Sequence, residues 1–321
     1  MQPKFIISID LGGTKILTAL INSKNEIVAR IKIPTDAEKG TEFLVASVAQ
    51  SVKQIMAENE ISERNVKAVC LGVPGTVNPY TGIISSAPNL RIKNFNIKEA
   101  MLGHLSVPVL IENDVNLAGL GIKKMEMKDQ INNMLVVFVG TGIGSALFFD
   151  GKIYRGSSFY AGEIGHIKID EKGNLSSSKL STTFELSSAR PAIVKAIKKD
   201  LRKGKKSLLS EYKSSKKALK SKGLAAALKK GDPIVTKYIS KSSNTIGTVI
   251  GSMTTFLNLD TIVLGGGIIE AMHAFMMPRI KTAFKDSVLT DPGRGVKIFA
   301  TKLGDDAALY GGIALVEEFL S

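Results

Sequence analysis

The sequence has 321 residues, 44% of them hydrophobic, and its 43 Lys and Arg against 29 Asp and Glu give a formal net charge of +14. A chain of this length buries a large core and divides into about two domains. No apolar run approaches the roughly 20 residues that a membrane span needs, and residues 1–15 lack the pattern of a signal peptide, so we expect a cytoplasmic protein. The single cysteine, Cys70, excludes an intramolecular disulfide and lies in an apolar run typical of a buried core residue.

The positive charge is concentrated in one segment, Lys195–Lys241, which we call the basic segment. It holds sixteen Lys and Arg against three acidic residues, whereas the rest of the chain holds 27 against 26. A run of like charges usually forms a solvated face, and a binding surface for a polyanion is the alternative. The basic segment has few aromatic residues, so we expect no specific nucleic-acid partner.

The first half of the chain predicts a meander of three strands followed by alternating helices and strands. The meander is expected at residues 5–9, 16–21 and 27–33, and Thr41 is expected to cap a helix that continues to Glu58. The remaining elements are predicted as strands at 66–73 and 107–111, a weak helix at 97–105, and a helix that begins at 114.

The second half repeats this plan. Asp150-Gly151 predicts a two-residue hairpin between two of its strands. The elements are predicted as strands at 134–139, 144–149, 152–154, 261–264 and 296–300, and helices at 185–203, 224–230, from Asp232-Pro233, after Gly267, and at 304–320. The pattern indicates two related α/β domains with a cleft between them, at 1–118 and 119–304, with the helix at about 305–321 packing back on the first.

Each half of the chain sends a glycine turn out of a buried strand. Gly12-Gly13-Thr14 and Gly140-Thr141-Gly142 allow backbone N–H groups to approach a phosphate closely, because no Cβ atom stands in the way. A triphosphate held from both sides is the predicted occupant. For Gly12-Gly13 the alternative is an ordinary hairpin turn, and for a third run, Gly265-Gly266-Gly267, it is the turn that starts a helix.

Seven short motifs together resemble the ROK family of sugar kinases, and they cover nearly the whole chain in order and spacing. They are D-L-G-G-T-K (10–15), G-V-P-G (72–75), A-P-N-L (87–90), E-N-D-V-N (112–116), V-G-T-G-I-G (139–144), A-G-E-I-G-H (161–166) and V-L-G-G-G-I (263–268). The resemblance implies a two-domain actin-like ATPase fold of the α/β class with an interdomain cleft. It also implies phosphoryl transfer from ATP to a sugar hydroxyl.

Phosphoryl transfer needs in-line positioning, neutralisation of charge and a base for the hydroxyl proton. The resemblance makes Asp114 that base, while the alternative is that Asp114 only caps the helix that follows it. Asp10 would hold Mg²⁺, and Thr14 and Lys15 would contact phosphate oxygens together with Gly12 and Gly13. Gly140, Thr141 and Gly142 would form the second phosphate loop, and Gly265, Gly266 and Gly267 would pass close to the adenosine and α-phosphate.

Sugar recognition needs several polar groups that converge on one ring, because each buried hydroxyl must be paired. The residues that match the family in this role are Asn89, Asn113, Glu163, His166 and Glu185. A lone Glu on a loop is usually only solvated, and a lone His in an apolar setting is usually a satisfied core group. The spacing of Glu163 and His166 behind a phosphate loop favours the functional interpretation.

One departure from the family pattern concerns zinc. Many members carry Cys-x-Cys-Gly-x-x-Gly-Cys-x-Glu after the Gly-His element, but here the cysteine positions read Ser176, Ser178 and Thr183. Neutral hydroxyls do not replace thiolates around zinc, so we expect no zinc. Glu185 remains at the last acidic position of the motif, and a sugar contact is therefore still expected there.

The sequence thus predicts an ATP-dependent kinase that acts on the 6-hydroxyl of a hexose, with glucose as the default substrate and a homodimer as the expected assembly. Family members without the cysteines include glucokinases that use polyphosphate. Ser145-Ala146, after the glycine turn, is also similar to the sequence of those enzymes, so polyphosphate is an alternative donor. Kinases of N-acetylhexosamines or fructose are further alternatives. A non-catalytic sugar sensor is another, although the first motif begins too early to leave room for the DNA-binding domain of ROK repressors.

Overall fold

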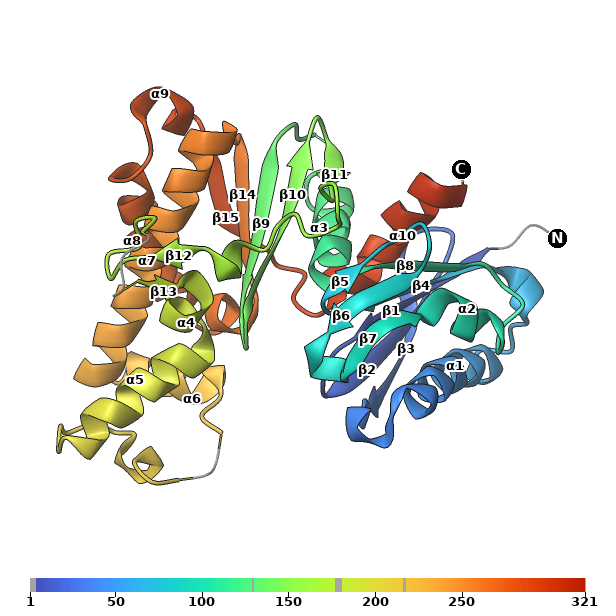
Figure 1. Cartoon of the computed structure of the whole chain (residues 1–321), viewed down its shortest axis with the longest axis horizontal. Coiled ribbons are helices and arrows are strands. Elements are labelled where there is room, and N and C mark those ends of the chain that lie inside the picture. The colour runs from blue at the N-terminus through green and yellow to red at the C-terminus, as the bar shows by residue number, and fades with distance from the viewer. Residues whose placement is uncertain (1–3, 129, 177–180, 216–217, 321) are drawn as a thin grey trace. The chain divides into compact units, whose positions relative to one another are not determined.

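A computed structural model describes the chain at residues 4–128, 130–176, 181–215 and 218–320 (Figure 1). The chain forms two compact units. The first unit consists of residues 1–130, 153–161 and 305–321, and the second of residues 131–152 and 162–304. The domain boundary expected after residue 118 falls inside α3 (Asp114–Met125), because that helix packs along α10 (Asp306–Leu320) in the first unit.

The first unit is built on a five-stranded sheet in the order β3-β2-β1-β4-β8. Its strands are β1 (Phe5–Leu11), β2 (Lys15–Ile21), β3 (Ile27–Pro34), β4 (Val66–Val73) and β8 (Val109–Asn113). The first three strands form the predicted antiparallel meander, and β4 and β8 run parallel to β1. The parallel strands β1, β4 and β8 therefore end at the same edge of the sheet, where Asp10 and Asp114 lie.

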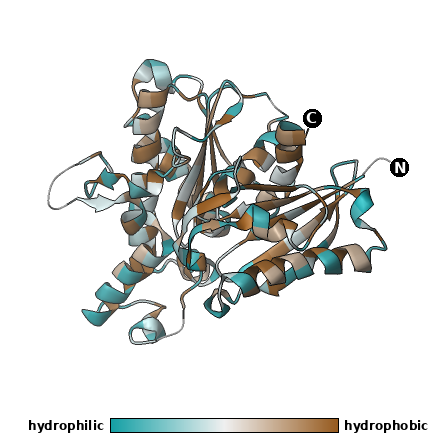
Figure 2. Ribbon diagram, turned by 45° about the vertical axis from the view of Figure 1, so that its right-hand side comes forward, coloured by the Kyte–Doolittle hydropathy of each residue, from teal (hydrophilic) through white to brown (hydrophobic). Residues whose placement is uncertain are grey.

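Helices cover both faces of this sheet. One face packs against α1 (Thr41–Glu58) and α2 (Ile97–Leu102), whose buried apolar residues share a core with Ile7 and Ile9 of β1. On the other face α10 lies so close that Gly312 faces Ser8 and Cys70. Figure 2 shows the sheet strands brown and the outer face of α1 partly teal, as expected for a helix with one solvated side.

Two details of the first unit differ from the sequence prediction. The N-cap of α1 is Gly40, with a φ of 97°, and Thr41 is the first helical residue, so the predicted Thr41 cap was wrong. A left-handed backbone conformation suits glycine there because it has no Cβ. The sequence also gave no sign of the small sheet β5-β6-β7, whose strands are β5 (Thr76–Val77), β6 (Ile83–Ala87) and β7 (Ile92–Asn96).

The second unit repeats the sheet topology of the first, in the order β11-β10-β9-β14-β15. Its strands are β9 (Met134–Val139), β10 (Ile143–Phe149), β11 (Lys152–Tyr154), β14 (Thr261–Gly265) and β15 (Lys297–Ala300). The predicted hairpin at Asp150-Gly151 is confirmed, since both residues have positive φ. A separate two-stranded sheet pairs β12 (Lys168–Ile169) with β13 (Thr182–Thr183).

The helices of the second unit confirm most of the predicted elements and correct one. They are α4 (Phe184–Ser188), α5 (Arg190–Arg202), α6 (Ser221–Lys229), α7 (Pro233–Leu257), α8 (Gly267–Lys285) and α9 (Thr290–Gly293). The single helix predicted at 185–203 is broken at Ala189, because Pro191 has no N–H and belongs in a first helical turn. In the described ranges, none of the helices is long and apolar enough to cross a lipid bilayer.

Helices α3 and α10 meet through glycine. A Cβ atom at Gly121 would lie 1.9 Å from the carbonyl oxygen of Ala307, and one at Gly311 would lie 1.9 Å from that of Leu117. The two backbones are therefore in direct contact, and no side chain fits between them. This contact fixes α3, and with it the residues at its N-terminus, relative to the C-terminal helix.

We predict that Gly311→Ala destabilises the protein by about 2 kcal/mol or more, because the new methyl group overpacks a backbone contact. The matched control is Gly223→Ala in α6, where the methyl group would meet only the flexible end of Leu219. Alanine favours a helix over glycine, so the control is expected to melt at or slightly above the wild-type temperature. Equal melting temperatures for the two variants, measured by circular dichroism, would disprove the close contact.

Candidate functional site

The edge of the first sheet carries an excess of buried negative charge. Asp10 lies near the end of β1, and burial raises its pKa to about 7, assisted by the nearby charges of Asp114 and Asp305 and opposed by Lys15. Gly72 of β4 leaves room here, since a Cβ atom on it would lie 3.4 Å from the Cα of Asp114. Two carboxylates at the carboxyl ends of parallel strands are thus crowded together, which suits a proton or a cation.

The turn between β1 and β2 is the hairpin turn that the sequence left open as an alternative. The N–H of Gly12 donates to the carbonyl of Lys15 at 2.9 Å, and the Thr35 hydroxyl donates to the carbonyl of Gly12 at 2.6 Å. Gly13 and Thr14 are exposed at its tip. Lys15 forms an ion pair with Asp305, and Asn89 lies against Gly13. The structure thus places five of the predicted site residues (Asp10, Gly12, Gly13, Thr14 and Lys15) on one turn, with Asn89 beside it.

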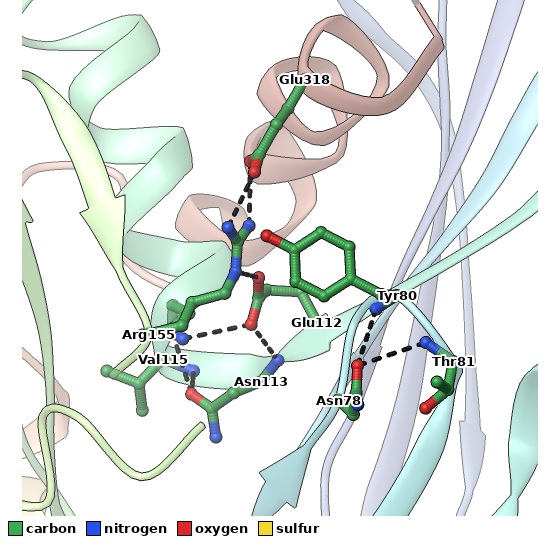
Figure 3. Close-up of polar contacts among 9 residues, drawn as sticks. Asn78, Tyr80, Thr81, Glu112, Asn113, Val115, Arg155 and Glu318 are labelled. Atoms are coloured by element: carbon green, nitrogen blue, oxygen red, sulfur yellow. Dashed lines mark hydrogen bonds and ion pairs between the residues drawn. The ribbon is translucent and has the colours of Figure 1, made fainter. Parts of the chain in front are cut away.

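Asn113, and not Asp114, caps the helix α3 that begins at the end of β8. Asn113 is the N-cap of α3, and its side-chain oxygen accepts hydrogen bonds from the N–H groups of Val115 at 2.9 Å and Asn116 at 3.0 Å (Figure 3). Its amide nitrogen donates to the carbonyl of Gly75 at 2.9 Å. Asp114 is the first helical residue and is half-buried, with one oxygen 2.9 Å from the N–H of Val115.

The glycine turn of the second unit is held by two side chains. A carboxylate oxygen of Glu185 accepts from the N–H of Ile143 at 2.8 Å, and a Cβ atom on Gly142 would lie only 2.6 Å from that oxygen. Arg190 donates from its guanidinium to the Thr141 hydroxyl at 2.7 Å and from its N–H to the carbonyl of Gly140 at 3.0 Å. Glu185 therefore stabilises the glycine turn, whether or not it also binds a ligand.

Glu163 and His166 lie together in a short 3₁₀ turn, Ile164–His166, next to this glycine turn. Their side chains are 3.6 Å apart, and both are largely exposed. Gly162 and Gly165 pack so closely that Cβ atoms on them would lie 2.4 Å from the carbonyl of Ser145 and 2.3 Å from that of Ile143. The structure thus gathers three predicted sugar ligands, Glu163, His166 and Glu185, at the start of β10.

Gly265-Gly266-Gly267 is the helix-start turn that the sequence offered as the alternative. Gly266 has a φ of 87° and is the N-cap of α8, and a Cβ atom on it would lie 2.7 Å from the carbonyl of Val139, just before the Gly140 turn. The first helical piece of α8, which ends at a kink where Met272 leaves helical geometry, thus begins beside the second glycine turn. The N-terminus of a helix favours an anion, so this turn and a phosphate site are compatible.

Hydrogen bonds hold residues 170–176 and 181–185, the described part of the segment compared above with the zinc motif. Thr183 is the N-cap of α4, and its hydroxyl accepts from the N–H of Leu186 at 3.2 Å. Asp170 closes a turn by accepting from the side chain and N–H of Asn174, and these bonds hold the pKa of its carboxyl below the usual range. Ser176 bonds to the backbone of Lys168, and Ser178 lies outside the described residues.

Metal ligands of the usual kind do not cluster in the part of the chain that the structure describes. No three of its His, Cys, Asp and Glu side chains are placed to hold a metal ion together. Mg²⁺ that arrives with nucleotide phosphates needs only one or two carboxylates, because it keeps several of its waters. Asp10, with its raised pKa and the carboxyl of Asp114 nearby, suits such an ion.

Two arginines of the site were missed by the sequence analysis. Arg190 stands in the first turn of α5, where the helix dipole disfavours a cation, and that unusual position was the available signal. Arg155 follows β11 and is buried among carboxylates of the first unit. No local pattern marks Arg155, because its partners Glu112 and Glu318 are 43 and 163 residues away in the chain.

The sequence profile of the ROK family matches residues 6–319. A glucokinase from Halalkalibacterium halodurans is 28% identical over 319 residues, which are 99% of this chain and 96% of that protein. A xylose repressor from Caldicellulosiruptor bescii is 25% identical over 97% of this chain and 77% of the repressor. The relatives therefore include both sugar kinases and a repressor of transcription.

The fold of the chain is also similar to that of solved ROK family proteins. A ROK family glucokinase from Streptomyces griseus, solved in complex with glucose and AMPPNP, superposes with a TM-score of 0.79 over 98% of this chain and 99% of that one, at 22% identity. This likeness confirms the expected α/β fold of the actin-like ATPase type.

We predict that Asp10→Asn stabilises the metal-free protein at alkaline pH. The unfolded chain loses the Asp10 proton near pH 4, whereas the folded protein keeps it to about pH 7, so the free energy of unfolding falls as pH rises through this window. Removing the charge is expected to raise the thermal midpoint by about 5 °C at pH 8 and by much less at pH 5. The control is Asp291→Asn, which removes a carboxylate at an exposed position. If Asp10→Asn changes the thermal midpoint by the same amount at pH 5 and pH 8, the charge of Asp10 is not buried.

Proposed function

We propose that this chain, which belongs to the ROK family, is an ATP-dependent kinase that transfers a phosphoryl group to the 6-hydroxyl of a hexose, with glucose as the first candidate. The observation that carries the proposal is the position of Asp114 beside Asp10 at one edge of the first sheet, with the helix cap supplied by Asn113. The match to glucokinases supports the same assignment.

Asp114 is proposed as the base that accepts the proton of the attacking hydroxyl. A carboxylate in that role need only lie within hydrogen-bond reach of the hydroxyl and keep its own charge. Asn113 is proposed to bind a sugar hydroxyl with the amide N–H that remains after its bond to Gly75. Its side chain is fixed by three hydrogen bonds, so it presents that N–H in one direction.

The other sugar contacts are proposed for Glu163, His166, Glu185 and Asn89. The carboxylate and imidazole of Glu163 and His166 are already 3.6 Å apart, and a ring with adjacent hydroxyls offers each of them a donor or an acceptor. Glu185 has one oxygen on the glycine turn and the other available for a sugar. This role would explain why the carboxylate is kept although the cysteines before it are replaced.

The phosphates of the donor are proposed to lie on the two glycine turns. Thr14 and the backbone of Gly12 and Gly13 serve from the first unit, and Gly140, Thr141 and the α8 N-terminus at Gly266 from the second. Lys15 carries the charge that an anion needs, although Asp305 now shares it. Asp10 would hold Mg²⁺, which neutralises the charge that develops on the transferred group.

Polyphosphate remains the alternative donor because most lysines of the basic segment that the structure describes are exposed. Part of its charge is already used inside the second unit: Asp200 accepts from Lys205 at 2.9 Å and from the Tyr238 hydroxyl at 3.0 Å. Most of the remaining cations are Lys, which suits solubility better than bidentate binding of phosphate. We therefore favour ATP, and the homodimer expected from the sequence stays a prediction.

A non-catalytic sugar sensor is the competing class, since a xylose repressor is among the relatives. Such a protein would bind a sugar without needing the base, the Mg²⁺ site or the phosphate turns. Asp10, Asp114 and Thr141 are all present here, which favours the enzyme. The decisive experiment incubates the wild type with glucose, mannose, fructose, allose and N-acetylated hexosamines, with ATP or polyphosphate as donor and Mg²⁺ present. Sugar binding without phosphorylation of any of them would establish the sensor instead.

We predict that Asp114→Asn lowers kcat by at least about 10²-fold while sugar binding is mostly retained, because the amide keeps the shape and loses the basicity. Turnover is measured by release of ADP in a coupled assay and sugar affinity by calorimetry. Near-normal turnover in the variant would exclude Asp114 as the base, whatever the sugar proves to be.

We also predict that Arg190→Gln raises the KM for the donor about tenfold, which corresponds to about 1.4 kcal/mol, with little change in the KM for sugar. The reason is that the guanidinium lies on the Thr141 hydroxyl of the proposed phosphate turn. Arg202→Gln, at the other end of the same helix, is the matched control for loss of one positive charge. A donor KM that rises equally in both variants would instead indicate general attraction by the basic segment.

A further inference from the structure

Arg155 is a buried cation at the end of β11, and it joins three stretches of the first unit that are far apart in sequence. Its Nε donates to Glu112 at 2.7 Å, and its two terminal nitrogens donate to the two oxygens of Glu318 at 2.7 and 2.9 Å (Figure 3). Burial disfavours the charge, but the bonds to Glu318 and Glu112 outweigh it, and the pKa of the guanidinium rises above its usual value. The guanidinium therefore stays charged at any ordinary pH.

Glu112 connects this arginine to the proposed base. The residue is only 1% exposed, and its two oxygens face different partners. One accepts from Arg155, and the other accepts from the N–H of Asn113 at 2.8 Å and from the side-chain amide of Asn116 at 3.1 Å. Asp114 lies in the chain between those two asparagines. The Glu112 carboxylate thus holds the backbone N–H just before Asp114 and the side chain of Asn116 just after it.

A buried ion pair is a weak source of stability, because the desolvation of both charges offsets their attraction. An apolar pair would fill the same space at similar cost, so stability alone does not account for the choice of residues. An arginine does what an apolar residue cannot, because its planar fork fixes two carboxylates in defined directions at once. It also balances the buried charge of Glu112.

The loop that carries Arg155 is itself held firmly in the first unit. Its ends meet where the N–H of Ala161 donates to the carbonyl of Arg155 at 3.2 Å, and Phe159 takes a φ of 64°, which is unusual for a side chain of that size. Aromatic contacts from Tyr80 to Phe159 and to Phe319 clamp it from outside, with ring centroids 6.1 and 5.6 Å apart.

The same loop leads directly into the proposed sugar loop. Residues 153–161 belong to the first unit, and the chain returns to the second unit at Gly162, one residue before Glu163. Arg155 lies in the chain after the glycine turn at Gly140 and before Glu163 and His166. Its ion pairs therefore anchor the segment that connects the proposed phosphate turn to the proposed sugar ligands. It fastens that anchor to the strand end that carries Asn113 and Asp114.

We propose that Arg155 is a positioning residue for phosphoryl transfer, which acts through Glu112 to hold Asn113 and Asp114 in the orientation that the sugar requires. Arg155 touches neither substrate nor donor in this role. The inference rests on the proposed kinase function. It assigns Glu318, at the end of α10, as the second carboxylate that keeps the guanidinium in place.

The test compares three variants: one changes both ion pairs of Arg155, one removes only its pair with Glu318, and one is a control. Arg155→Lys keeps the positive charge, but a lysine has no planar group that can bind both carboxylates. Glu318→Gln removes the charge of the more exposed carboxylate, so we expect this variant to fold. The matched control is Glu317→Gln, which breaks an ion pair of the adjacent α10 residue, that of Glu317 with Lys124 of α3 at 2.9 Å. For each variant kcat, the KM values for sugar and donor, and the thermal midpoint are measured.

We expect kcat to fall about 10²-fold in Arg155→Lys and about tenfold in Glu318→Gln, because a misplacement of about 1 Å at the reacting centre has effects of this size. The KM for sugar rises through Asn113, while the KM for donor stays near the wild-type value. The control keeps all three parameters. A merely structural role would instead lower the thermal midpoint and the active fraction, and leave kcat per active site and the sugar KM unchanged.

Equal kinetics for Glu318→Gln and Glu317→Gln, together with normal kcat in folded Arg155→Lys, would overturn the positioning role while the kinase assignment stands. If the wild type phosphorylates no sugar with either donor, the kinase assignment fails, and the role of Arg155 fails with it. A tenfold lower kcat in Glu318→Gln with an unchanged melting temperature would support the role even if Arg155→Lys does not fold.

Discussion

The chemistry proposed for the first unit depends on how it accommodates carboxylates in a place with little water. Asp10, Glu112 and Asp114 lie at the ends of parallel strands, where burial raises the free energy of each negative charge. Glu112 is compensated by a built-in cation, Arg155, and is thereby kept as a fixed structural charge. Lys15 lowers the pKa of Asp10 but also pairs with Asp305, so burial prevails and that pKa is raised to about 7. The protein thus permanently neutralises one carboxylate and leaves another ready for an ion that enters with the substrate.

The two units place their loops by the same topology. In each, a three-stranded meander is followed by two strands parallel to its first, and the turn between the first two strands carries the glycines. The loops then differ in what supports them. Gly12 bonds to Lys15 and Thr35 within a plain hairpin, whereas the Gly140 turn is held from outside by Glu185 and Arg190. A duplicated framework with separately evolved supports explains why the two turns are only weakly alike in sequence.

Periodicity in the sequence predicted β4 to the residue and α1 to within one residue at its start, because a long apolar stripe or a buried run has few alternative structures. The two-residue strands β5, β12 and β13 carry too few side chains to produce a pattern. At the site, motifs located the glycine turns and the Asn113-Asp114 pair, but not which of the two residues caps the helix, since both types suit that position. The role of Arg155 could not be predicted from the sequence, because its partners Glu112 and Glu318 are distant in the chain.

The discontinuous composition of the first unit bears on how the protein is made. Its sheet is complete once β8 has been synthesised, yet Gly312 of α10, which packs against Ser8 and Cys70, lies beyond the whole of the second unit in the chain. Glu112 meets a guanidinium once Arg155 has been made, but that guanidinium meets its second carboxylate only with Glu318. The face of the sheet that α10 covers is therefore left without this partner until α10 is synthesised. The final turn of α10, with Glu318, closes the first unit and completes the support of the site in one step.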